Sequence, residues 1–60
     1  MSAEILIIDD NSDIRLILNE LISEAGYKTR LAANYNQALT EIDKKLPDVA
    51  IIDVKLDKGD

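Results

Sequence analysis

Three aspartates follow the two most apolar segments of the sequence. Asp9 and Asp10 come directly after the segment from Glu4 to Ile8, and Asp53 follows the aliphatic segment from Val49 to Ile52. Two adjacent carboxylates repel each other, and partial burial adds to the free-energy cost of keeping both ionised. A cation offsets that cost. The acid pair therefore predicts a cation site, provided that Asp53 lies close to it in the fold.

Short aliphatic segments predict the strands that position these carboxylates. Residues 4–8 and 49–52 are apolar almost without interruption, which is typical of strands buried on both faces of a parallel sheet. Residues 27–32 (YKTRLA) are more polar and predict a strand at the edge of the sheet.

Two segments with apolar residues at helical spacing separate these strands. The first helix is expected to have Ser12 as its N-cap, to use Asn11 as a turn residue or secondary cap, and to end at Gly26. The second has Asn34 as its N-cap and Gln37 three residues later, as in a capping box. The two apolar faces, which we expect in the core, are Ile14, Ile17, Leu18, Leu21, Ile22 and Ala25, and then Tyr35, Ala38, Leu39, Ile42 and Leu46.

The order strand, helix, strand, helix, strand predicts an α/β fold with a parallel sheet and right-handed crossovers. With the first strand in the middle, the spatial order is 2-1-3, with one helix on each face. Strands one and three then end side by side at the point where the connections leave in opposite directions, and ligands bind there in open α/β sheets. Asp9, Asp10 and Asp53 converge in this arrangement. They form an acidic cluster suited to a hard divalent cation such as Mg²⁺.

The composition restricts the function classes. The 60-residue chain has a net charge of -5, which argues against a nucleic-acid-binding surface and against attraction to anionic lipids. It has no cysteine and no histidine, so it lacks disulfides, thiolate sites and the commonest general base. No apolar run reaches the ~18 residues of a membrane span, and no basic region precedes the first apolar segment as in a signal peptide. We therefore expect one small cytoplasmic domain.

Four motifs in combination resemble one protein family. They are ILIIDDN at residues 5–11, GY at 26–27, ALTEI at 38–42 and PDVAIID at 47–53. With these motifs the chain is similar to the N-terminal half of a bacterial response-regulator receiver (CheY-like) domain. The DIR motif at residues 13–15 is similar to the receivers of NtrC/NtrX-type nitrogen regulators. The resemblance covers essentially the whole chain and implies half of a flavodoxin-like doubly wound fold, βαβαβ.

The resemblance also implies a phosphotransfer function. In such domains the third aspartate, here Asp53, accepts a phosphoryl group from a sensor histidine kinase. The implied Mg²⁺ ligands are Asp10 directly, Asp9 through water, Asp53, and the backbone carbonyl of Lys55. A carboxylate nucleophile needs the incoming charge neutralised, and a metal held by neighbouring carboxylates does this. The implied role is that of a phosphoacceptor module in two-component signalling and not that of an enzyme.

Part of the family pattern has no counterpart in this sequence. Later strands of a complete receiver supply a hydroxyl residue and a lysine that contact the phosphoryl group. Thr29 and Thr40 precede the third strand, and Lys55 and Lys58 follow Asp53 too closely to lie on a later strand. We therefore expect residues 1–60 to be a truncated receiver domain of three strands and two helices, in which phosphotransfer is impaired.

An alternative function is a structural half-domain that self-associates and has no phosphotransfer activity. Residues 49–52 form an edge strand in the 2-1-3 order, and an uncovered edge is a template for pairing with another chain. Sixty residues without a disulfide hardly offset the entropy of the unfolded chain. We expect a homodimer with antiparallel pairing of this strand, in the order 2-1-3-3-1-2, or with the helices packed face to face.

Two further enzyme or cofactor classes fit the sequence less well. A haloacid-dehalogenase-like phosphatase needs a second aspartate two residues after the nucleophile, where this chain has Lys55. A dinucleotide-binding fold needs glycines after the first strand, and DDNSD has none.

Overall fold

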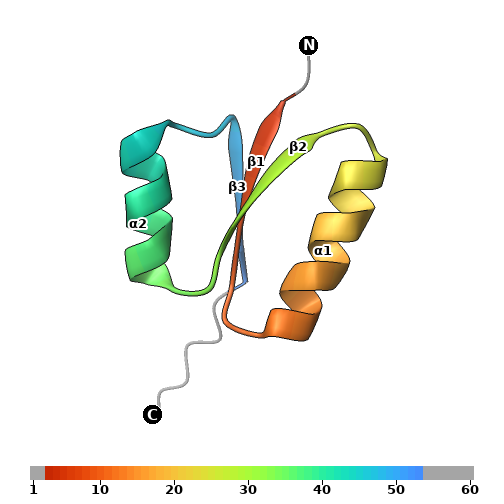
Figure 1. Ribbon diagram of the computed structural model, residues 1–60, viewed down its shortest axis with the longest axis horizontal. Helices are drawn as coiled ribbons and strands as arrows, with labels where there is room; N and C mark the ends of the chain where they lie inside the picture. Colours follow the sequence, from red (N-terminus) through yellow and green to blue (C-terminus); the bar gives the residue numbers. More distant parts are fainter. Residues whose placement is uncertain (1–2, 54–60) are drawn as a thin grey trace.

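A three-stranded parallel sheet with one helix on each face forms the protein (Figure 1). The computed structural model describes residues 3–53, and of Asp53 it describes the backbone alone. The elements follow in the order β1 (Glu4–Asp9), α1 (Ser12–Glu24), β2 (Lys28–Ala32), α2 (Tyr35–Lys44) and β3 (Val49–Asp53). The strand order is β2-β1-β3. The predicted α/β class, parallel order and alternation of elements are therefore confirmed.

The central strand β1 explains its own aliphatic sequence. Hydrogen-bonded neighbours lie on both sides of β1, with Ile5 opposite Thr29 of β2 and Val49 of β3. Helices contact it from both faces, and the side chains of Leu6 and Ile7 are fully buried. A strand enclosed on all sides has no polar face, so its sequence does not alternate. The buried cluster around it comprises Leu6, Ile8, Ala32 and Ala38, with Ile42 packed against it.

Asparagine side chains begin both helices. Asn11, and not the predicted Ser12, is the N-cap of α1, since its Oδ1 accepts hydrogen bonds from the N–H groups of Asp13 at 2.9 Å and Ile14 at 3.2 Å. Ser12 becomes the first helical residue instead. Asn34 is the N-cap of α2, as predicted, and accepts a hydrogen bond from the Gln37 N–H at 2.8 Å. An acceptor one residue outside the helix satisfies N–H groups that have no partner in the first turn.

The prediction that the apolar helix faces lie in the core is wrong for most of their members. No residue of α1 is fully buried, and Leu21 is 60% exposed. Ile14, Ile17 and Ala25 are exposed as well, and on the second face so are Tyr35, Leu39 and Leu46. The cause is the width of the sheet, because three strands offer each helix too little surface to bury its whole apolar face.

The third strand has an uncovered edge, as the predicted order requires. It contacts β1 and, within residues 3–53, neither helix. Val49 is 51% and Ile52 64% exposed. No helix in this described part of the chain has the length and apolar character needed to cross a membrane. The cytoplasmic location expected from the sequence stays a prediction.

Candidate functional site

The residues predicted for the cation site lie at one end of the sheet. Asp9 is the last residue of β1, Asp53 is the last residue of β3, and the two are direct partners in the parallel register. Neighbouring strands lie roughly 5 Å apart, so the backbones of these residues are close together. Asp10 follows in the turn to α1, where it is exposed. The predicted convergence of the three positions is observed, whereas Lys55 lies outside the described residues.

Asp9 is a buried carboxylate with one oxygen satisfied and one not. Its side chain is 2% exposed, and its Oδ1 accepts a hydrogen bond of 2.9 Å from the Asn11 N–H. Its Oδ2 is buried and has no hydrogen-bond partner among residues 3–53. A buried polar group without a partner costs roughly 1–3 kcal/mol, and a charged one costs more. The second oxygen is therefore an acceptor that a cation, or a water bound to one, would satisfy.

Asn11 fixes the turn between the acid pair and α1. Its N–H binds Asp9, its side chain caps the helix, and its carbonyl oxygen accepts a 2.9 Å hydrogen bond from the Arg15 N–H. The predicted local role of Asn11 as a turn residue or secondary cap is confirmed in its turn position, and Asn11 is the N-cap itself. Because the positive end of the helix dipole lies just beyond this turn, it also stabilises negative charge there.

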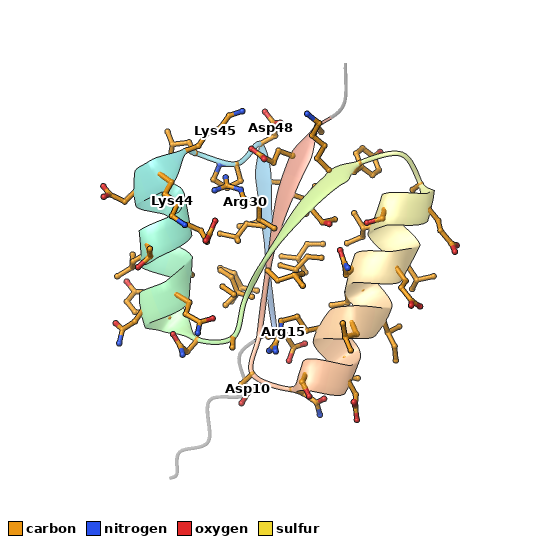
Figure 2. All side chains as sticks on the ribbon, viewed as in Figure 1. Asp10, Arg15, Arg30, Lys44, Lys45 and Asp48 are labelled. Atoms are coloured by element: carbon orange, nitrogen blue, oxygen red, sulfur yellow. The ribbon has the colours of Figure 1, made fainter. Side chains whose placement is uncertain are left out.

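Arg15 contacts the same turn from within α1. Its Nη1 donates a 2.7 Å hydrogen bond to the backbone carbonyl oxygen of Asp9. Figure 2 shows the Arg15 side chain lying at the end of the sheet where Asp10 also lies. The sequence gives no signal for this contact, because helical spacing does not distinguish an arginine that reaches back to a strand from one that points into water.

The donor chemistry of this turn fits Mg²⁺. Carboxylate and carbonyl oxygens are its preferred ligands, and Mg²⁺ keeps several waters, so few protein ligands suffice. Asp9 and Asp10 supply two carboxylates, one of them with a buried open oxygen. No group of three histidine, cysteine or acidic residues able to hold a metal occurs in the described part of the chain, which does not include the Asp53 side chain.

A second ionic cluster lies at the opposite end of the sheet, around Arg30 (Figure 2). The Arg30 side chain is 17% exposed and donates to the carbonyl oxygens of Glu41 at 2.7 Å and Lys45 at 2.6 Å. It also forms ion pairs with Glu4 and Glu41. The Lys44 hydrogen bond and charge, followed by those of Arg30, lower the pKa of the Glu41 carboxyl from its ordinary value of 4.5. Since Arg30 satisfies carbonyl groups at the C-terminal end of α2, this cluster is structural.

Comparison with known proteins agrees with this fold. Residues 5–60 match the response regulator receiver domain, and the chain belongs to that family. It is 45% identical over 56 residues to sporulation initiation phosphotransferase F of Bacillus subtilis (strain 168), which covers 93% of this chain and 45% of that protein.

Similarity extends to transcriptional regulators. The chain is 34% identical over 53 residues to transcriptional regulatory protein YxdJ of the same bacterium, covering 88% of this chain and 23% of that one. It is 34% identical over 56 residues to nitrogen assimilation regulatory protein NtrX of Azorhizobium caulinodans, covering 93% and 12%. The chain thus spans less than half the length of these relatives.

The predicted family is confirmed: this is a receiver domain of a two-component response regulator. The similarity to an NtrX protein that the DIR motif indicated is also found. Receiver domains in general use Mg²⁺ for phosphorylation and interact with histidine kinases or phosphotransferases.

Proposed function

We propose that Asp53 is the phosphoacceptor of this domain and that Asp9, Asp10 and Asp53 bind Mg²⁺ together with the backbone carbonyl of Lys55. One observation carries the proposal. Asp9 lies in direct register with Asp53, and a buried oxygen of Asp9 has no hydrogen-bond partner among residues 3–53. The family's general use of Mg²⁺ supports the assignment of roles.

The proposed reaction transfers a phosphoryl group from a sensor histidine kinase to Asp53. A carboxylate oxygen of Asp53 forms a bond to phosphorus while the bond between phosphorus and the kinase histidine nitrogen breaks, and that histidine takes up a proton. Asp10 would hold the ion directly, and Asp9, which Asn11 orients, would hold it through a bound water. Mg²⁺, when bound, neutralises the charge of the phosphoryl oxygens. The domain acts as an acceptor and does not turn over a free substrate as an enzyme does.

A Mg²⁺ titration followed by amide chemical shifts tests the binding site. We expect weak binding, with the largest shifts at Asp9, Asp10 and Asp53. Asp10→Asn should weaken binding more than Asp43→Asn, which removes the same charge from an exposed position on α2. Shifts that are largest elsewhere would show that the acidic turn is not the site.

We also propose that the 60-residue chain by itself is a poor phosphoacceptor, because no hydroxyl or lysine from a later strand lies in it. Losing one preorganised charge-stabilising donor typically slows a reaction by about 10²–10³-fold. Incubation with a small phosphodonor and Mg²⁺, followed by intact mass measurement, tests this, with Asp53→Asn as the control. Rapid and nearly complete phosphorylation that Asp53→Asn abolishes would refute the impairment and keep the assignment of Asp53. No uptake at all would favour the second candidate function.

That second candidate is a self-associating half-domain without phosphotransfer activity, and the exposed edge of β3 supports it. The aliphatic side chains of Val49 and Ile52 are more than half exposed, and no helix within residues 3–53 contacts the strand. A two-fold axis brings the same edge of two chains together, so antiparallel pairing of β3 with its copy continues both sheets in the order 2-1-3-3-1-2. Packing of the exposed helix stripes against each other is the other geometry.

Sedimentation across a concentration series tests self-association. We expect a dimer whose dissociation coincides with unfolding, because a core this small depends on the added contacts. Ile51→Lys, in the middle of β3, should disrupt the dimer and the fold together. A cooperative folded monomer that persists at high micromolar concentration would refute the homodimer.

A further inference from the structure

Arg15 holds the backbone at the point where β1 ends. Its Nη1 lies 2.7 Å from the carbonyl oxygen of Asp9, and its side chain reaches from α1 to this end of the sheet (Figure 2). It forms no ion pair with any carboxylate whose side chain the structure describes. The guanidinium therefore acts on the peptide group of the acid pair and not on the carboxylates themselves.

We propose that Arg15 is a positioning residue for the cation site, an inference that rests on the proposed Mg²⁺ binding at Asp9 and Asp10. The peptide group is planar, so a hydrogen bond that fixes the Asp9 carbonyl also fixes the Asp10 N–H direction. This restricts where the Asp10 backbone places its carboxylate. Such outer contacts orient metal ligands before the ion binds and reduce the cost of ordering them.

Asp9 is then fixed from two sides. Arg15 binds its backbone carbonyl at 2.7 Å, and the Asn11 N–H binds its Oδ1 at 2.9 Å. The Arg15 N–H also donates to the Asn11 carbonyl at 2.9 Å, which joins both contacts to the first turn of α1. These bonds leave Oδ2 as the acceptor without a partner among the described residues. The turn is thus arranged so that the free oxygen of Asp9 and the exposed carboxylate of Asp10 remain for the cation.

A purely electrostatic role of Arg15 predicts the opposite effect of its removal. Without the guanidinium the acidic turn becomes more negative, and Coulomb attraction alone then strengthens cation binding. If Arg15 positions Asp10, the same change weakens binding, because the ligands must be ordered when the ion arrives. The sign of the affinity change therefore separates the two roles.

The experiment is a Mg²⁺ titration of the 60-residue chain, followed by amide shifts, for the wild type, Arg15→Gln and Lys28→Gln. Lys28 is exposed and lies opposite Glu4 in the strand register, at the other end of the sheet, so its replacement removes the same charge far from the acid pair. We expect about tenfold weaker Mg²⁺ binding for Arg15→Gln. Mutations of residues that hydrogen-bond to metal ligands weaken metal binding by about 10–100-fold, and this value is the lower end of that range. Lys28→Gln should stay within about twofold of the wild type, because salt screens distant charges.

The outcomes distinguish this inference from the proposed function. If the wild type shows no shifts at Asp9, Asp10 and Asp53, both are overturned. If it binds there and folded Arg15→Gln binds equally or more tightly, the positioning role alone is overturned. Circular dichroism shows whether Arg15→Gln folds. If it does not, Arg15→Lys decides, since lysine keeps the charge and lacks the planar guanidinium: weaker binding supports the inference and unchanged binding overturns it.

Discussion

Replacing Asp9 with asparagine is expected to stabilise the fold while it weakens the cation site. Asp9 is the buried charged residue of the described part of the chain, at 2% exposure. Asparagine keeps an oxygen that accepts the 2.9 Å hydrogen bond from the Asn11 N–H. It replaces Oδ2, which has no partner among the described residues, with a neutral NH₂ group and removes a negative charge beside Asp10 and Asp53.

The structure sets the size of this effect. A buried neutral polar group without a partner costs roughly 1–3 kcal/mol, and a charged one costs more. The NH₂ group of asparagine still lacks a partner among the described residues, so the gain is only the excess cost of the charge. We expect this excess to be about 1–2 kcal/mol. A domain of this length has a free energy of unfolding of roughly 3–9 kcal/mol, which makes the gain easy to measure. With a urea slope of ~1 kcal/mol/M, the midpoint moves upward by about 1–2 M.

Urea unfolding at one fixed protein concentration, with and without Mg²⁺, measures both parts of the prediction. Without Mg²⁺, Asp9→Asn should exceed the wild type in stability, while Asp43→Asn, a change of the same charge at an exposed position, should not. With Mg²⁺ at ten times its dissociation constant, the wild type gains about 1.4 kcal/mol and the variant gains less. A variant that is less stable than the wild type, or that Mg²⁺ stabilises equally, would refute the assignment of Asp9 to the cation site.

Two predictions concern the Arg30 cluster. Arg30→Met should lower the free energy of unfolding by about 2–3 kcal/mol, because carbonyls of α2 lose a charged donor; urea unfolding that shows no more loss than for exposed Lys28→Met would contradict this. Lys44 and Arg30 lower the Glu41 pKa from 4.5, so the stability that Glu41 contributes is present above that pH and lost as the pH falls through the lower folded value. Thermal unfolding measured across a pH series should therefore show the wild type to be more stable than Glu41→Gln near neutrality, and the two stabilities should converge in acid. A stability difference that stays constant with pH would refute this origin.

The topology and the position of the acid pair were predictable from short sequence patterns. Uninterrupted aliphatic segments indicate strands enclosed on both faces, and β1 is such a strand. The alternation of strands and helices limits a parallel sheet to few arrangements, and the order with β1 in the middle places Asp9 beside Asp53. Both inferences depend on properties that repeat over several residues, so one unusual side chain does not change them.

The burial of the apolar helix faces and the long-range side-chain contacts were not predictable in the same way. The apolar stripe of α1 indicates which face turns toward the sheet, but its period does not state how wide that sheet is. Leu21 therefore fits the pattern and is still 60% exposed. Arg15 and Arg30 each bind a carbonyl oxygen six or more positions away in the sequence, and flexible side chains reach such partners without leaving a periodic signal. The N-cap of α1 is Asn11 and not Ser12, a difference of one residue, and asparagine and serine are both favoured at N-cap positions.

The proposed cation site and the proposed self-association would each supply stabilising contacts that the described residues lack. Few side chains are fully buried in the described residues, and the acid pair includes a buried oxygen without a partner. If a cation binds at the acidic turn, it stabilises the folded chain by mass action, and a second copy on the edge of β3 would do the same. The two proposed sites lie on different surfaces, because the proposed cation site is where the strands end and the proposed pairing runs along the edge of β3. If unfolded chains bind neither, each ligand increases the population of folded chains that the other requires, so the two binding events favour each other even without direct contact.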